Sequence, residues 1–106
     1  MTFHERARFE AQAHVLKALA HPTRLFIVEV IAEKPFCVNE LTKKIGADMS
    51  TVSKHLSVLK NAGLILDEKK GKQVYYSLKM HCVLNFMDCV EAVLKEQAKK
   101  SQAVIS

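Results

Sequence analysis

The chain has 106 residues, of which 49% are hydrophobic and 25% charged, and its formal net charge is +5. This length allows one domain with a single core, and the composition excludes a disordered, collagen-like or low-complexity chain. No apolar run approaches the roughly 20 residues of a membrane-spanning helix, and residues 1–10 lack the apolar stretch of a signal peptide. Three cysteines, an odd and small number, argue against a secreted disulfide framework, so we expect a cytoplasmic protein.

Two helices are predicted in the first third of the chain. Apolar residues recur at spacings of three and four, which predicts a helix over about residues 4–20. The sequence His21-Pro22 ends it, because proline is favoured in the first turn of a following helix. That second helix, over about residues 22–33, is apolar on most sides, which is typical of a central core helix, and Pro35 stops it.

The middle of the chain predicts a pair of helices joined by a short turn. After an extended link at residues 36–38, a helix is expected over residues 39–45, where Gly46 ends it. Asp48 is a favourable N-cap for a helix over residues 49–61.

A change in the apolar period from 3.6 to 2 follows this helix pair. Two β-rich runs, residues 64–66 and 74–78, flank a charged, glycine-containing turn at residues 67–72, which predicts a hairpin. A long amphipathic helix is expected over about residues 80–99. The predicted fold is a single domain over residues 1–106, mainly α with a small β-hairpin.

The order of these elements is that of a winged helix-turn-helix, with the helix-turn-helix at residues 39–61 and the wing at residues 64–78. In this arrangement the second helix of the pair enters the major groove of DNA. The charge distribution agrees, because residues 36–78 hold seven basic and four acidic groups, a net charge of +3, whereas the segments on either side carry +1 each. A basic segment favours a nucleic-acid partner.

Small polar and basic side chains gather on the predicted second helix. Val52, Leu56 and Leu59 occupy its inward positions. The candidate DNA-binding residues on the opposite face are Met49, Ser50, Thr51, Ser53, Lys54 and Ser57, with His55 beside them. Hydroxyls can contact phosphates or base edges, and a lysine can pair with phosphate or guanine. The alternatives are capping chemistry for the serines and threonine, and a packed structural role for the histidine.

Three lysines at the predicted hairpin tip, Lys69, Lys70 and Lys72, form a basic finger suited to phosphates or a neighbouring minor groove. The alternative is a solvated loop, since exposed charges are the norm. Order and spacing favour DNA binding, because the helix pair, the polar face and the basic hairpin follow one another within about 40 residues.

The chain resembles the ArsR/SmtB family of small prokaryotic repressors over essentially its whole length. The matching stretches are Leu19-Ala20-His21-Pro22-Thr23-Arg24-Leu25, Glu40-Leu41, Asp48-Met49-Ser50-Thr51-Val52-Ser53-Lys54-His55-Leu56-Ser57-Val58-Leu59, Ala62-Gly63-Leu64 and Val74-Tyr75-Tyr76-Ser77-Leu78. The resemblance implies a homodimer, paired through its first and last helices, that represses transcription from an inverted-repeat operator of double-stranded DNA. One departure concerns the wing, where Asp67 and Glu68 stand at positions that are often basic and should weaken its attraction for phosphate.

The family's effector motifs are incomplete here. Members usually release DNA when a metal, arsenite or a thiol oxidant binds, and the arsenic-type motif has the form Cys-Val-Cys-Asp-Leu. This chain reads Cys37-Val38-Asn39-Glu40-Leu41, with only the first thiol. The zinc-type stretch reads Met80-His81-Cys82, with no later histidine, so no metal site is predicted with its full ligand set.

The three thiols, Cys37, Cys82 and Cys89, remain as candidate effector or redox residues. Cys82 and Cys89 share a helix face but lie about 10.5 Å apart along the axis, too far for a disulfide within one helix. If two such helices pair antiparallel, Cys82 of one chain can approach Cys89 of the other, or Cys37 can join one of them. These arrangements could hold arsenite, a soft metal ion, or a regulatory disulfide or polysulfide. The alternative is that all three are ordinary buried thiols, which behave as small hydrophobes.

Other function classes fit less well. No glycine-rich phosphate loop, paired-carboxylate motif or metal triad supports catalysis, so we expect no enzyme. A winged-helix protein-interaction module would have lost the small polar face, and RNA binding would call for exposed stacking aromatics on a sheet.

Overall fold

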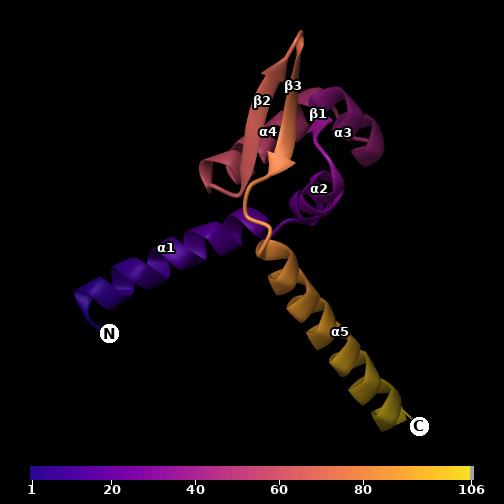
Figure 1. The fold of residues 1–106 in the computed structure, drawn as a ribbon. Coiled ribbons are helices and arrows are strands. Elements are labelled where there is room, and N and C mark those ends of the chain that lie inside the picture. The colour runs from indigo at the N-terminus through magenta and orange to yellow at the C-terminus, as the bar shows by residue number, and fades with distance from the viewer. Residues whose placement is uncertain (106) are drawn as a thin grey trace.

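The chain folds into helices and a small antiparallel sheet, whose hairpin of β2 and β3 projects beyond the helices (Figure 1). The computed structural model describes the backbone of residues 1–105 and the side chains of residues 1–101. The elements in chain order are α1 (Phe3–Leu19), α2 (Pro22–Glu33), β1 (Phe36–Cys37), α3 (Val38–Ile45), α4 (Met49–Asn61), β2 (Ile65–Lys70), β3 (Gln73–Leu78) and α5 (Val83–Ile105). The predicted winged helix-turn-helix fold is confirmed.

Local capping chemistry sets the starts of α2 and α4. The Thr23 backbone N–H donates to His21 Nδ1 at 3.1 Å, and Pro22 needs no acceptor in the first turn. The Thr51 backbone N–H donates to Asp48 Oδ1 at 2.7 Å. Both helices therefore begin and end at the predicted residues.

The sheet is larger than the predicted hairpin. Its strand order is β1-β3-β2, with Phe36 opposite Tyr76 and Cys37 opposite Tyr75, so the expected extended link at residues 36–38 is in part a third strand. The prediction of a six-residue turn at residues 67–72 was also wrong. Strand β2 extends to Lys70 and β3 starts at Gln73, so only Gly71 and Lys72 lie between the two strands. The tips of both strands are exposed, so their side chains lack the apolar alternation that marks a strand in sequence.

The start of α5 also differs from the prediction. We expected the last helix over about residues 80–99, but it begins at Val83 and continues to Ile105. The backbone N–H groups of Lys79 and Met80 instead donate to the carbonyl of Leu64, at 3.0 and 3.3 Å. These two hydrogen bonds join the segment that follows β3 to Leu64, the residue before β2. The first turn of α5 therefore begins further along the chain than predicted.

The core lies between α2, α3, α4 and the sheet. Its fully buried side chains come from α2, α3 and α4: Ile27, Val28, Ile31, Leu41, Val52, Leu56 and Leu59. Three of these seven belong to α2, which confirms its predicted place as the central core helix.

Two helices leave this core as arms. In Figure 1, α1 and α5 extend from the body in different directions. Only Ala18 and Leu19 of α1, and only Val83 among the described side chains of α5, are buried. The Cα radius of gyration is 16.8 Å, against about 13 Å for a compact domain of this size. Among the described residues, no helix combines the length and hydropathy needed to cross a membrane.

Candidate nucleic-acid interface

The polar face predicted on α4 is present and open to solvent. Its exposed residues are Met49, Ser50, Thr51, Ser53, Lys54 and Ser57. The opposite side of the helix is fully buried, with Val52, Leu56 and Leu59 at 0% exposure. The structure therefore brings six of the seven candidate residues on this helix together on one accessible surface.

One residue of this face was missed from the sequence. Val58 is 39% exposed and stands one helical turn beyond Lys54. Its spacing from Lys54 places it on the polar face, but its apolar character made it look like a core residue. With Met49, it adds an apolar contact of the kind that packs against a thymine methyl group.

The start of α4 is a set of hydrogen bonds to one carboxylate. Asp48 Oδ1 accepts from the Thr51 backbone N–H at 2.7 Å and from Ser50 Oγ at 3.1 Å. The Thr51 hydrogen bond is the main reason that the pKa of Asp48 lies below its usual value. Because the Ser50 hydroxyl donates to Asp48, it presents its lone pairs, as a hydrogen-bond acceptor, to anything that approaches the helix.

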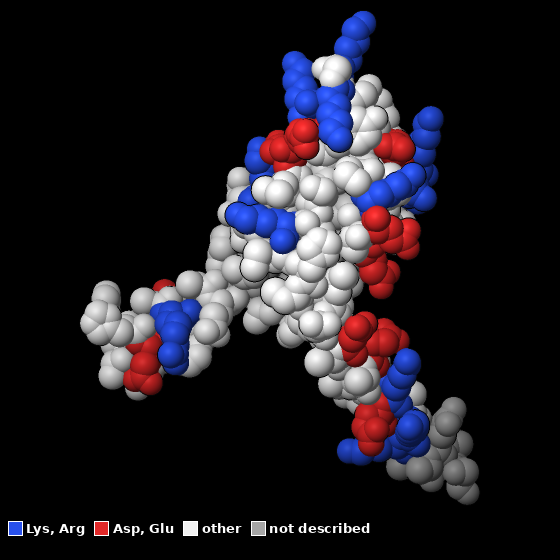
Figure 2. Space-filling view, viewed as in Figure 1, with Lys and Arg blue, Asp and Glu red and all other residues white. Residues whose placement is uncertain are grey.

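The wing places three lysines at the end of the hairpin. Lys69, Lys70 and Lys72 surround Gly71, whose φ of +64° suits the left-handed turn between β2 and β3. Figure 2 shows these basic side chains projecting from the tip, away from the arms. This position gives the finger free access to a polyanion.

The acidic residues of the wing have different surroundings. Asp67 Oδ2 accepts from Lys60 Nζ at 2.8 Å, and this hydrogen bond raises the pKa of Lys60. The pair joins the last turn of α4 to β2, so the Asp67 charge is opposed within the protein. Glu68 lies opposite Tyr75 on β3 and is exposed.

His55 lies away from the other candidates on α4. It is partly buried, and its ring centroid is 4.4 Å from that of His21 at an interplanar angle of 45°. Burial, followed by the charges of His21 and Arg24, lowers the pKa of His55. Of the two roles considered for this residue, the packed one accounts for its position in the free protein.

The three thiols lie in different surroundings and none is in a disulfide. Cys37 is 5% exposed and precedes α3, where its backbone N–H donates to Glu40 Oε1 at 3.0 Å. Cys82 and Cys89 are exposed. Among the described residues, no group of three or more His, Cys, Asp or Glu side chains is close enough to hold a metal ion.

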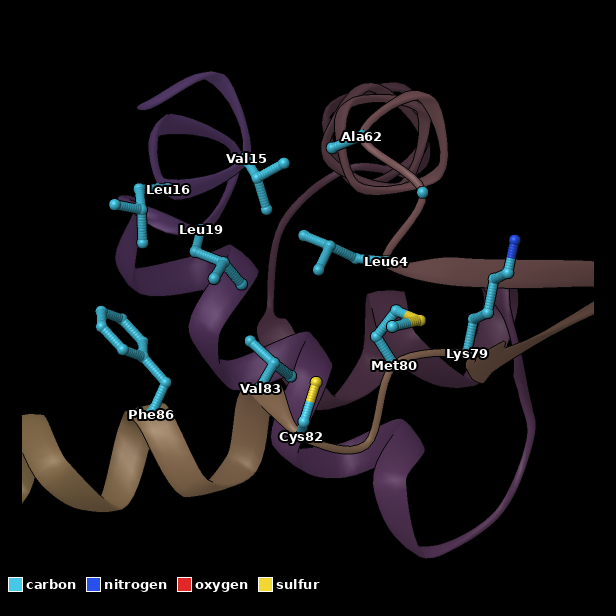
Figure 3. A pocket seen from close by; sticks show the side chains of 11 residues that line it. Val15, Leu16, Leu19, Ala62, Leu64, Lys79, Met80, Cys82, Val83 and Phe86 are labelled. Atoms are coloured by element: carbon cyan, nitrogen blue, oxygen red, sulfur yellow. The ribbon is translucent and has the colours of Figure 1, made fainter. Parts of the chain in front are cut away.

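Cys82 lines a groove of about 420 Å³ between the two arms and the body. Figure 3 shows Leu16 of α1 above Phe86 of α5 at one end of it, with Met80 and Cys82 in the segment that precedes α5. A second groove, of about 780 Å³, lies along α5 and includes Phe26 and Leu94. Both grooves are mainly apolar and share Phe86.

Comparison with known proteins agrees with this geometry. The family model described as "Bacterial regulatory protein, arsR family" matches residues 21–66. A biofilm growth-associated repressor of Xylella fastidiosa is 32% identical over 89 residues, which are 84% of this chain and 78% of the relative. The arsenical resistance operon repressor of Escherichia coli is 33% identical over 92 residues, 86% of this chain and 79% of the relative.

Solved structures show the same architecture. NolR from Sinorhizobium fredii superposes with a TM-score of 0.81 at 26% identity, covering 88% of this chain and 93% of NolR. A homodimeric winged helix-turn-helix DNA-binding domain from Mycobacterium bovis, a possible ArsR-family regulator, gives 0.77 at 28% identity, covering 91% and 89%. The chain therefore belongs to the arsR family of bacterial regulatory proteins, and it is a winged helix-turn-helix transcriptional regulator rather than an enzyme.

Proposed function

We propose that this protein is a homodimeric repressor that binds an inverted-repeat operator through α4 and the wing. The observation that carries the proposal is the exposed face of α4, where short polar side chains and Lys54 stand opposite a fully buried apolar side. Short side chains allow a helix to lie deep in a major groove about 12 Å wide. The lysines of the wing tip supply contacts to the phosphate backbone beside it.

The arms supply the second half of the proposal. Apolar side chains on α1, α2 and α5 are exposed in the single chain, among them Leu16, Phe26, Phe86, Val90 and Leu94. A continuous apolar surface of this kind is typical of an interface. The homodimeric relative from M. bovis supports a second copy as the partner. Two-fold symmetry then places two half-sites about 34–36 Å apart on the DNA.

Replacing Ser53 and Lys54 together with alanine tests the DNA-binding face. We expect operator affinity to fall, and the slope of log K against log salt to flatten by about 0.9 for each phosphate that a subunit no longer neutralises. Fluorescence anisotropy with a labelled operator at several salt concentrations measures both quantities. Lys100→Ala, on the far end of α5, is the matched control for the removal of a positive charge.

An unchanged affinity of the Ser53 and Lys54 double variant would mean that α4 does not read the operator. If the wild-type protein showed no preference for any DNA sequence, the rival assignment, a protein-interaction module, would replace the repressor.

For the effector, we propose that the cysteine thiols sense arsenite, a soft metal ion, or an oxidant or sulfur species. Phe86, Cys89 and Val93 recur at spacings of three and four, so they share one stripe of α5. Cys82 directly precedes α5, where its carbonyl accepts from the Phe86 backbone N–H at 3.4 Å, and its spacing of four from Phe86 continues this stripe. On the proposed dimer this stripe borders the partner, where Cys82 of one chain and Cys89 of the other can come together. Thiolates are the preferred ligands of soft metals.

Single Cys37→Ser, Cys82→Ser and Cys89→Ser variants test this proposal. We expect arsenite or a thiol oxidant to weaken operator binding by the wild-type dimer, and expect Cys82→Ser or Cys89→Ser to abolish that response. If only Cys37→Ser loses the response, the sensing thiol is Cys37, directly before α3. Operator binding that ignores both reagents in the wild type would assign all three cysteines to a structural role.

A further inference from the structure

A cluster of basic side chains lies outside the polar face of α4, where the start of α2 meets the side of α4. It consists of His21, Arg24 and His55. The two imidazole rings pack against each other with their centroids 4.4 Å apart and their planes tilted by 45°, although the residues are far apart in sequence. The Thr23 backbone N–H donates to His21 Nδ1 at 3.1 Å, which leaves Nε2 as the ring nitrogen of His21 that can donate to a ligand.

One donor of this cluster has no hydrogen-bond partner in the part of the chain that the structure describes. Arg24 Nε is buried and donates to no acceptor among the described residues. The first turn of α2 carries no acidic residue, so the positive end of the helix dipole adds to the charge of the guanidinium. Burial is the first cause of the lowered pKa of His55, and His21 and Arg24 lower it further, as expected for a ring beside other basic groups. A buried, unpaired donor in a positive potential favours an anionic acceptor.

The position of the cluster on α4 indicates which anion. His55 follows Lys54 and lies about 100° further round the helix, beside the exposed face. Lys60, which is paired with Asp67 of the wing, lies about 140° round from His55 on the other flank. A helix that fills the major groove has a sugar–phosphate backbone along each flank. If α4 fills the groove, the wing therefore lies beside one backbone and the cluster of His21, Arg24 and His55 lies on the side of the other.

We propose that the cluster of His21, Arg24 and His55 binds a phosphodiester group of the operator backbone, on the flank of α4 opposite the wing. This inference rests on the proposed function, since it assumes that α4 enters the groove. The guanidinium of Arg24 supplies the charge, and His21 Nε2–H supplies an additional hydrogen bond. Such a contact fixes the register of the protein on DNA but carries no sequence information.

Replacing Arg24 with glutamine tests the contact in the full-length dimer. We expect the magnitude of the salt slope of operator binding to fall by about 0.9 per subunit, or about 1.8 per dimer. Affinity for operator and for random DNA should fall by similar factors, so the ratio between them stays at the wild-type value. Arg24→Lys, which retains the charge, should keep most of the slope.

The matched control is Arg8→Gln, because Arg8 lies on the distal half of α1, where its guanidinium stacks on Phe9 at 4.7 Å. It should leave the slope unchanged. His21→Asn is a second variant that keeps a capping residue at the start of α2 and removes the imidazole. It should weaken binding to both DNAs equally without lowering the melting temperature by more than a few degrees.

Three results would overturn the inference. In the first, the salt slope of Arg24→Gln equals that of the wild type. In the second, Arg24→Gln loses the preference for operator over random DNA and Arg24→Lys does not restore it, as expected if Arg24 only orders α4. The third result applies if Arg24→Gln does not fold: His21→Asn then binds both DNAs as tightly as the wild-type protein does. A reduced slope in Lys54→Ala alone would leave the proposed function intact and reject only this cluster.

Discussion

At the scale of single residues, His55 links the stability of the fold to pH. Its ring is partly buried against His21, and burial is the largest cause of its lowered pKa. Above about pH 6.5, the usual value for histidine, the residue is neutral in both folded and unfolded chains and adds no pH dependence. As the pH falls through 6.5, the unfolded chain takes up the proton first, so the folded state loses stability.

We expect His55→Gln to reduce the loss of thermal stability between pH 7.5 and 5.5. Glutamine keeps a polar side chain of similar length and removes the titrating ring. Melting temperatures measured by circular dichroism at fixed protein concentration give the comparison. His4→Gln, on the exposed start of α1, is the matched control and should keep the wild-type loss. If the melting temperatures of His55→Gln and the wild type fell equally between pH 7.5 and 5.5, His55 would not be the source of this pH dependence.

The residues of the recognition face could be predicted because helical periodicity is local. Val52 and Leu56 define the buried side, and the polar residues between them must then face outward. The packing of His55 on His21 could not be predicted from the sequence, because it depends on how α2 packs against α4. Val58 was missed for another reason: its spacing from Lys54 places it on the polar face, but its apolar side chain resembles that of a core residue.

At the scale of elements, a short turn that begins at Gly46 joins α3 to α4. Gly46 ends α3 with φ of +79°, a left-handed conformation in which other residues are strained. A Cβ atom added at this position would meet nothing within 4 Å, so the cost of a substitution is conformational rather than steric.

Gly46→Ala should therefore lower the free energy of unfolding by about 1 kcal/mol. Gly46→Asn should cost less, because asparagine enters the left-handed region more readily. Urea denaturation at fixed protein concentration measures both differences. Wild-type stability in the alanine variant would show that the turn tolerates another conformation.

The bounds of helices were easier to predict than those of strands, for a physical reason. Asp48 and Pro22 act within one turn of the chain, so their effect can be read from neighbouring residues. Strand β1 consists of two residues whose partners on β3 lie about 40 positions later, and no local pattern marks it. The late start of α5 likewise depends on a backbone contact with Leu64.

At the scale of the whole molecule, most of the described side chains of α5 are exposed in the single chain. Leu94 is 54% exposed and lines the larger groove. We expect Leu94→Lys to convert the dimer to a monomer in sedimentation experiments, because a charge replaces an apolar side chain in the interface. Operator affinity should fall by at least about 100-fold, since two linked half-sites are no longer bound together.

The same experiment needs a control on the same helix. Glu96 lies about 200° round the helix from Leu94, so Glu96→Lys places an identical side chain on the opposite face. It should sediment as the wild type, and both variants should keep the helical circular dichroism spectrum of the core. A dimeric Leu94→Lys protein would place the interface elsewhere.

The two arms have a consequence for how much active protein a cell holds. Few of their side chains belong to the core of their own chain, so on the proposed dimer they are covered only when two chains meet. Mass action then makes the amount of complete repressor vary with the square of chain concentration when chains are scarce, and linearly when they are abundant. A repressor built in this way sets a threshold of expression below which its operator stays open.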